Sequence, residues 1–306
     1  MNILLLGQHD DYQILHVAAA LEAQRHSPII LDTRLYPSAI ALSWEPTNAN
    51  GTLAIADKNI RFNEIAAAYW HKFNPVSANT QLTSSQQAIA SQDAASALNT
   101  LFYCPSIRWV NGVGAIRYHQ SKPLQLNHVY RLGIPIPATY IGNSPLQSMS
   151  FFNEHDEVII KPVHGGATAQ LASRKHQSHA YLVKALALSP VTLQAYVPGA
   201  DIRTYVFGDV TYSVEIYSQY TDYRDDPKVT AVIHETPRHV CAQAVAVCKA
   251  LGMVWCAIDW RRDSNGCYYF LEANPCPYFV YIERTTGFPL TENLVRLLLL
   301  TATEEA

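Results

Sequence analysis

The segment VWCAIDWRRDSNGCYYFLEANP contains the residues with the clearest potential for chemistry. Asn265-Gly266, in its middle, is the preferred pair for a two-residue type I′ loop in a β-hairpin. Counting outward from that loop places Asp259 directly opposite Glu272. Asn274 follows two residues later, so we expect its side chain on the same face as that of Glu272. Three side chains with oxygen ligands are therefore predicted to lie together.

Two opposed carboxylates in such an apolar hairpin need a compensating positive charge. Their Cβ atoms would lie roughly 4.5 to 5.5 Å apart, where like charges destabilise a sheet, and the apolar neighbours add a cost of burial. A divalent cation would supply the charge, because Asp, Glu and Asn offer the hard oxygen ligands that Mg²⁺ or Mn²⁺ prefers. We therefore predict a metal site formed by Asp259, Glu272 and Asn274. Two exposed acids at a sheet margin, or a register shifted by a bulge, are the alternatives.

Two lysines are candidates for binding phosphate. Lys161 ends the apolar run of residues 158–160 and precedes the turn Gly165-Gly166. A lysine at the end of a buried strand can hold a phosphate while the N–H groups of such a turn approach it. An edge-strand lysine before an ordinary loop gives the same pattern. Lys122, on a predicted helix, is by itself typical of a surface lysine.

Charged side chains also follow predicted strands further along the chain. Asp201 and Arg203 alternate on one face of the strand in IRTYVF. Arg224 and Asp226 belong to a charged cluster, YRDD, that comes after another strand. Each group alone is typical of a solvated face, so the candidates depend on their joint order along the chain.

The elements that must position these residues indicate an α/β (α+β) protein. A strand at residues 3–6, a helix at 12–25 and a strand at 28–31 form a β-α-β pattern, which predicts a small parallel sheet. A further strand at 66–70 precedes a helix that closes the first domain near residue 112. A GxGxxG fingerprint is absent after the first strand, so a dinucleotide-binding role has little support.

The remaining chain changes character near residue 192. Before it, a helix, the lysine strand, the glycine turn and another helix predict a compact α+β unit. After it, successive strands and a Gly-Asp turn predominate, with helices at 240–251 and 291–299. We predict three domains, at 1–112, 113–191 and 192–306.

Composition limits the classes of protein and partner. A chain of 306 residues is long enough for two or three domains with a large core. The net charge of −3, without a basic stripe, disfavours nucleic acid as a partner. The chain has no apolar run of about 18 residues, so we expect no membrane span. With no basic leader and no CxxC spacing, we expect a cytoplasmic protein with reduced cysteines, and a symmetric dimer would be the commonest homo-oligomer.

The motifs SKPLQL, VIIKPVHGG, LQAYVPGADIRTYVFGD, TDYRDD, CAIDW, LEANP and IERTTG, in this order, resemble the successive motifs of the ATP-grasp superfamily. The resemblance covers about residues 111–299. It is closest to the ribosomal-protein glutamate ligases and the graspetide (microviridin-type) peptide maturases. The N-terminal segments GQHDD and LDTRLYPSAIAL also resemble the leading domain of these peptide maturases. It implies a three-domain ATP-grasp fold with a Rossmann-like N-terminal domain.

The resemblance also implies a role for each candidate residue. Arg203 and Arg224 would face the γ-phosphate and the acyl phosphate, and Asp201 would lie near the ribose. The backbone of residues 194–197 would contact adenine. The implied metal ligands are again Asp259, Glu272 and Asn274. The implied nucleotide-binding residues are Lys122, Lys161, Gly165, Gly166, Gln194, Ala195, Tyr196, Val197, Asp201, Arg224 and Asp226.

The implied chemistry is the ATP-dependent joining of a carboxylate to an amine or a hydroxyl group. ATP and Mg²⁺, or Mn²⁺, would convert the carboxylate into an acyl phosphate, and Arg203 could stabilise the oxyanion formed on attack. The aromatic residues after LEANP favour a peptide or protein substrate, with an amino-acid substrate as the alternative within the same chemistry. A non-catalytic ATP-binding regulator and a kinase-like phosphotransferase are the other classes. No general base is evident from the sequence.

Overall fold

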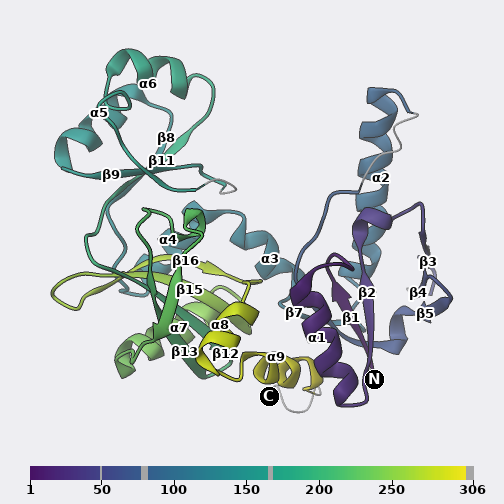
Figure 1. Cartoon of the computed structure of the whole chain (residues 1–306). Helices are drawn as coiled ribbons and strands as arrows, with labels where there is room; N and C mark the ends of the chain where they lie inside the picture. The colour runs from purple at the N-terminus through teal and green to yellow at the C-terminus, as the bar shows by residue number, and fades with distance from the viewer. Residues whose placement is uncertain (49, 77–81, 165–167, 301–306) are drawn as a thin grey trace. The chain divides into compact units, whose positions relative to one another are not determined.

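The computed structural model describes residues 1–48, 50–76, 82–164 and 168–300 (Figure 1). The chain forms two compact units, the first containing Met1–Val113 and Cys276–Ala306 and the second containing Gly114–Pro275. In the part of the chain that the structure describes, every helix is too short or too polar to cross a membrane.

A four-stranded parallel sheet organises the first unit. Its strand order is β2-β1-β6-β7, and the predicted β-α-β pattern at the N-terminus is present. The intervening helix α1 (Tyr12–Ala23) begins at Asp11, whose carboxylate accepts the N–H groups of the first turn. The strands are β1 (Asn2–Leu6), β2 (Ser27–Leu31), β6 (Ile65–Trp70) and β7 (Arg108–Val110).

The first unit also contains a small antiparallel sheet that the sequence analysis did not predict. Its order is β3-β4-β5, and a long helix, α2, contacts β3. The remaining elements of this unit are β3 (Ile40–Glu45), β4 (Asn50–Ile55), β5 (Lys58–Arg61), α2 (Ser84–Phe102), α8 (Val280–Thr286), α9 (Leu290–Leu299) and the 3₁₀ turns Thr33–Leu35 and Phe62–Glu64.

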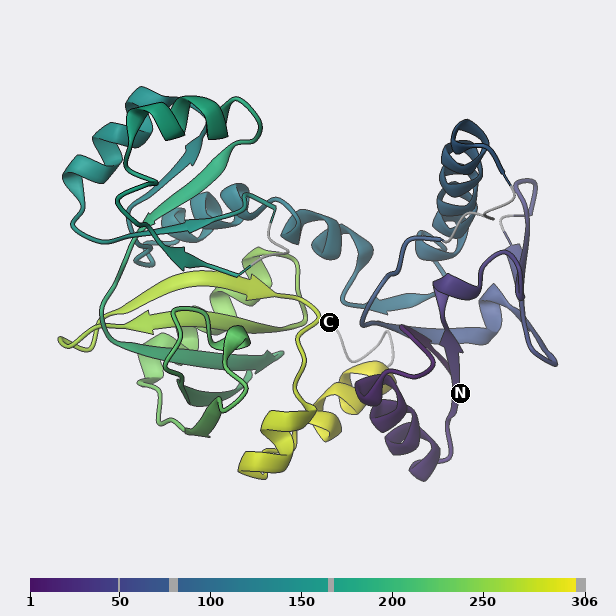
Figure 2. The ribbon, with the colours of Figure 1, turned by 45° about the horizontal axis from the view of Figure 1, so that its top comes forward.

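The second unit contains two antiparallel sheets, of which the smaller carries the lysine strand. Its order is β10-β9-β11-β8, and α5 and α6 lie side by side on one of its faces (Figure 2). Buried Phe151, Phe152, Leu182 and Leu186 fill the space between helices and sheet. The elements are β8 (Thr139–Gly142), α5 (Pro145–Glu154), β9 (Val158–Lys161), β10 (Gln170–Leu171), α6 (His179–Leu186) and β11 (Val191–Ala195).

The larger sheet has the order β14-β13-β12-β15-β16. Helix α7 covers one face, where Val240, Ala244 and Val247 pack against Ile202 and Ile258. The opposite face is left for polar side chains. The elements are α3 (Val113–His119), α4 (Lys122–Arg131), β12 (Ala200–Phe207), β13 (Val210–Tyr217), the 3₁₀ turn Tyr223–Asp225, β14 (Thr230–Ile233), α7 (Arg238–Ala250), β15 (Trp255–Arg262) and β16 (Tyr268–Asn274).

The two compact units differ from the three predicted domains in the place of the C-terminal segment. The first boundary, predicted at residue 112, lies one residue from the end of the N-terminal segment at Val113. The segment from Cys276 onward, which we placed in the domain 192–306, belongs to the first unit. The reason is the apolar stripe of α9, whose buried Leu290, Leu294 and Leu298 pack where α9 contacts α1 and β6. The division near residue 192 stays a prediction.

Candidate functional site

The hairpin of β15 and β16 places Asp259 directly opposite Glu272, as predicted. The turn that joins the strands is different from the prediction. The N–H of Gly266 donates to the carbonyl of Asp263 at 3.1 Å, and the N–H of Asp263 donates to the carbonyl of Cys267 at 3.0 Å. Three residues, 264–266, therefore form the loop, with Gly266 at φ +80°. The prediction of a two-residue loop was wrong.

A bulge at Leu271 corrects the register that the longer loop shifts. Trp260 pairs with Phe270, whereas the next pair is Asp259 with Glu272, so Leu271 is the extra residue of β16. Without the bulge, Leu271 would lie opposite Asp259, and Glu272 would lie opposite Ile258 and face the apolar core, because a slip of one residue reverses the face of every side chain. The two deviations from the predicted hairpin cancel at the carboxylate pair.

Arg203 extends the carboxylate pair into a row across three strands. It lies directly opposite Asp259 on the neighbouring strand β12. Its guanidinium donates to the two carboxylate oxygens of Asp259 at 3.1 and 3.3 Å, and also to the hydroxyl of Tyr223. Burial raises the pKa of Asp259 to about 6, although Arg203 opposes this change. We refer to Arg203, Asp259 and Glu272 as the charged row.

Lys122 neutralises the other end of the charged row. It lies at the start of α4, and its ammonium group forms an ion pair with Glu272. Burial by itself would favour the neutral acid, but the charge and hydrogen bond of Lys122 hold the pKa of Glu272 at about 2. Protein cations therefore compensate both carboxylates in this structure.

Lys161 lies at the end of β9, as predicted, and a buried side chain orients it. Its ammonium group donates to Gln194 Oε1 at 3.0 Å, and the Gln194 amide donates to the Thr139 hydroxyl at 2.9 Å. Burial lowers the pKa of Lys161 to about 8, while the nearby charge of Glu272 opposes the change. The sequence predicted a role only for the backbone of Gln194, as part of an adenine-binding segment. In the structure its side chain also binds Lys161. The predicted Gly165 and Gly166 lie outside the described residues.

The connection between β11 and β12 contains the predicted adenine-binding backbone. The N–H of Ala195 donates to the carbonyl of Ala138 at 2.8 Å, and that of Tyr196 donates to the carbonyl of Glu157 at 2.9 Å. Among the residues that the structure describes, the N–H of Val197 has no acceptor. This donor is therefore available to a ligand.

Asp201, the predicted ribose ligand, forms an ion pair with Arg261 at 2.7 Å, a partner that the sequence analysis missed. Burial raises the pKa of Asp201, although Arg261 opposes the change. Asp201 also lines a cavity of about 820 Å³ together with Tyr196 and Asp226. Lys122, Lys161 and the charged row do not line this cavity.

Arg224 and Asp226, the predicted nucleotide-binding residues after β13, form hydrogen bonds with residues of their own loop. Arg224 donates through Nε to Asp222 at 2.8 Å, and the other oxygen of Asp222 accepts the N–H of Ala169 at 3.0 Å. Asp226 accepts the Ser218 hydroxyl at 2.9 Å and two backbone N–H groups of its own loop. Asp222, within the motif TDYRDD, is a positioning residue that the sequence analysis did not single out.

The donor set at the charged row fits a hard divalent cation. Asp259 and Glu272 share one face of adjacent strands, and Asn274 ends β16 two residues later, with its backbone opposite Ala257. All three side chains offer oxygen, the donor that Mg²⁺ and Mn²⁺ prefer. Their assignment as metal ligands stays a prediction.

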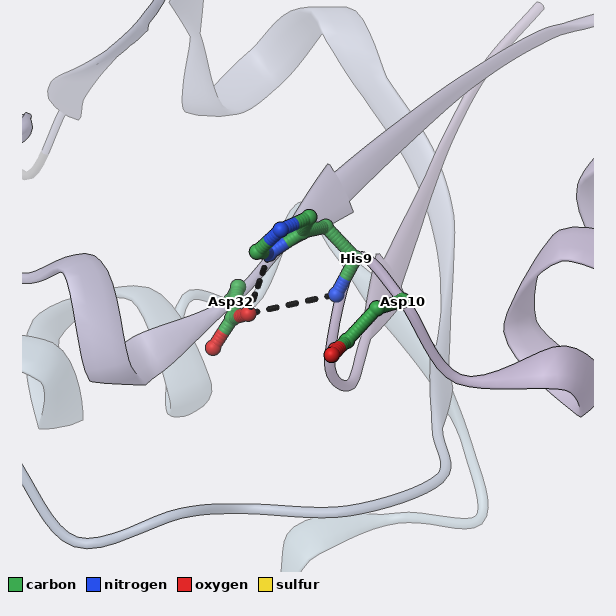
Figure 3. A group of neighbouring side chains, drawn as sticks. All are labelled: His9, Asp10 and Asp32. Carbon is green, nitrogen blue, oxygen red and sulfur yellow. Dashed lines mark hydrogen bonds and ion pairs between the residues drawn. The ribbon is translucent and has the colours of Figure 1, made fainter.

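A second group of possible metal ligands lies in the first unit, after β1 and β2. His9, Asp10 and Asp32 each place a ligand atom within 4.8 Å of the others. Figure 3 shows the ring and the N–H of His9 directed at the Asp32 carboxylate, at 2.7 and 3.2 Å. Arg34, however, donates to both oxygens of Asp32 at 2.9 and 3.1 Å and to Asp10 at 2.7 Å. This group is an ion-pair network centred on Arg34.

The chain is similar to known proteins in parts of its sequence. The MvdD pre-ATP grasp domain family matches residues 2–117. A "Probable alpha-L-glutamate ligase 1" of Shewanella oneidensis is 29% identical over 216 residues, which covers 64% of this chain and 71% of that protein. A "Probable alpha-L-glutamate ligase 1" of Shewanella baltica is 28% identical over 222 residues, with the same coverage.

Solved structures match almost the whole chain. The macrocyclase MdnC of Microcystis aeruginosa, bound with the precursor peptide MdnA, has a TM-score of 0.88 at 19% identity and covers 98% of this chain and 100% of its own. The ATP-grasp ligase PsnB, complexed with a phosphomimetic variant of a minimal precursor, Mg and ADP, has a TM-score of 0.84 at 22% identity and covers 97% of each chain.

Proposed function

Since the chain is an ATP-grasp ligase related to the α-L-glutamate ligases and to the microviridin and graspetide macrocyclases, we propose that it activates a carboxylate of a peptide as an acyl phosphate. An amine or a hydroxyl group then attacks this intermediate to form an amide or an ester. The mixed α/β ATP-grasp fold predicted from the motifs is confirmed.

The observation that carries the proposal is the charged row with its two lysines. Arg203 and Lys122 pair with the two carboxylates, and Lys161 is close enough for the charge of Glu272 to affect its pKa. Phosphoryl transfer requires several positive charges around the moving group, with little covalent participation by the protein. The row supplies fixed cations together with two carboxylates that fit a divalent ion.

Each residue of the site has a physical role in this chemistry. Lys122 and Lys161 hold phosphate oxygens, because both ammonium groups lie close to Glu272 of the charged row. Arg203 is always charged, and it stabilises the negative charge that develops on the acyl phosphate and on the tetrahedral oxyanion. Arg224, oriented by Asp222, adds a second guanidinium. Mg²⁺, held by the carboxylates of the charged row, would neutralise phosphate charge when bound.

The connection between β11 and β12 supports the binding of a nucleotide. The available N–H of Val197 is a donor for an adenine nitrogen, and Asp201 and Tyr196 line the adjoining cavity on the side proposed for the ribose. ATP and Mg²⁺ are therefore the proposed cofactors. PsnB, with 22% identity and the same fold, was solved with Mg and ADP.

A peptide is the proposed carboxylate substrate because MdnC and PsnB, which share the fold, were solved with precursor peptides. The relatives described as α-L-glutamate ligases favour a second candidate, the addition of an amino acid. The two activities differ in product mass, since a bond within one peptide removes water and an addition gains a residue.

The test is incubation of the protein with ATP, Mg²⁺, glutamate and peptides encoded beside its gene, followed by mass spectrometry and an ADP assay. We expect ADP release together with loss of water from a peptide. Gain of a glutamate residue would favour amino-acid addition, and a stable phosphorylated product would identify a phosphotransferase. If the protein binds ATP but releases no ADP with any substrate, the result would favour a non-catalytic ATP-binding regulator.

Variants then test the proposed metal ligands. Asp259→Asn and Glu272→Gln should each abolish turnover, because each removes a charge from the proposed Mg²⁺ site. Asp209→Asn is the matched control, since Asp209 is 79% exposed and pairs with Lys249 at the surface. Near-normal turnover by Asp259→Asn would refute the metal assignment.

A further inference from the structure

Arg261 makes an unusual set of contacts for a residue outside the charged row. It lies on β15, and its side chain is 12% exposed. Its Nε donates to the carbonyl of Val197 at 3.0 Å, and Nη2 donates to the carbonyl of Gly199 at 2.8 Å and to the hydroxyl of Tyr196 at 3.2 Å. Nη1 pairs with Asp201 at 2.7 Å. One guanidinium thus holds the whole connection between β11 and β12.

The pairing of β12 with β15 explains why the guanidinium is oriented in this way. Both strands contain the pattern Asp-x-Arg, as Asp201 and Arg203 on β12 and as Asp259 and Arg261 on β15. The strands are antiparallel, so Asp201 lies opposite Arg261 and Arg203 lies opposite Asp259. Each acid faces the arginine of the other strand. The Asp201 carboxylate therefore fixes one edge of the Arg261 guanidinium and leaves its other donors for the connection.

The backbone of the connection approaches β15 closely at Gly199. This glycine has a φ of +145°, and a Cβ added to it would lie 2.0 Å from the carbonyl oxygen of Arg262. Only glycine fits such an approach without displacing the backbone. The connection is therefore held against β15 twice, by hydrogen bonds to Arg261 and by the close contact at Gly199.

We propose that Arg261 is a positioning residue for nucleotide recognition, which sets the place of the Tyr196–Gly199 backbone that meets the purine base. The inference rests on the proposed function, because it requires that this connection binds adenine. Arg261 holds the carbonyl of Val197, in the peptide group that follows the available N–H of the same residue, so it fixes the backbone directly beside the donor that would meet the ligand. The aromatic ring of Tyr196, 5.3 Å from the guanidinium, is held by the same residue.

The experiment compares Arg261→Lys with Arg262→Lys as a matched control on the adjacent position, whose side chain faces Glu215 instead. Lysine retains the positive charge that pairs with Asp201 but cannot donate to two carbonyls and a hydroxyl at once. Loss of charge-assisted hydrogen bonds predicts that KM for ATP and the Kd for ATP rise about tenfold to hundredfold. We expect kcat at saturating ATP to change by less than about threefold.

A purely structural role for Arg261 would have a different result. In that case Arg261→Lys would lower the melting temperature and leave KM and the preference for ATP over GTP unchanged, which would overturn the inference. The variant Gly199→Ala provides a second route, since it displaces the connection while Arg261 stays intact, and it should raise the Kd for ATP in the same way. An unchanged Kd in Gly199→Ala would also count against the inference.

The wild-type protein separates this inference from the proposed function. If the wild type does not bind ATP in calorimetry, the proposed function fails. If the wild type binds ATP and Arg261→Lys binds it equally well, only the role of Arg261 is refuted.

Discussion

The lowered pKa of Lys161 predicts that ATP binding weakens steeply in mildly alkaline solution. Burial shifts this pKa from 10.5 to about 8. A phosphate group interacts best with the protonated amine, so affinity should be full below pH 8 and fall as the pH rises through that value. Each pH unit above the pKa reduces the charged fraction about tenfold, so the Kd for ATP should rise roughly 30-fold between pH 7 and pH 9.5.

An ordinary lysine would behave differently over the same range. With a pKa of about 10.4, it would still be about 90% protonated at pH 9.5, and the Kd would change by only about 10%. The assay is a titration with ATP by calorimetry at constant ionic strength, from pH 7 to pH 9.5. The dependence of log Kd on pH bends at the pKa of the free protein, so the bend measures Lys161 directly.

Two variants assign the bend to this residue. Lys161→Arg keeps its charge throughout this range and should give a flat profile. Gln194→Leu removes the acceptor that stabilises the ammonium group, so its bend should move below pH 8. A wild-type profile that is flat to pH 9.5, or a bend that persists in Lys161→Arg, would refute the reasoning.

Three other substitutions test the packing and register of the described residues. Asp259→Asn leaves Arg203 buried without its carboxylate and should lower the free energy of unfolding by about 3–5 kcal/mol. The double variant Arg203→Met with Asp259→Leu removes both charges, so its free energy of unfolding should be close to that of the wild type. Calorimetry of unfolding distinguishes the two variants. Deletion of Leu271 removes the extra residue of β16 and keeps Glu272 opposite Asp259, so Mg²⁺-dependent ATP binding should be retained, with loss of binding as the contrary result. Gln13→Leu removes hydrogen bonds of 3.0 and 2.8 Å to two backbone groups near the start of α8, which hydrogen exchange should detect as faster exchange there; unchanged exchange would contradict this role.

The sequence alone determined which residues would form the carboxylate pair and which motifs would accompany it. Opposed acids in an apolar hairpin are informative because their cost must be compensated, and this held although the loop is one residue longer than predicted. The β-α-β start was also readable, since Asp11 caps α1 and the first strand is apolar throughout. The local hydrophobic pattern and the alternation of side chains along a strand are enough to predict these features.

Only the tertiary structure decided how the charges pair and which segments pack together. The bulge at Leu271 depends on Tyr268, Phe270 and Ala273 all reaching the same core, which sequence periodicity does not show. The role of Arg261 depends on a strand register that pairs it with Asp201, about 60 residues earlier in the chain. Such contacts are set by the packing of distant elements, and a local pattern contains no information about a partner so far away.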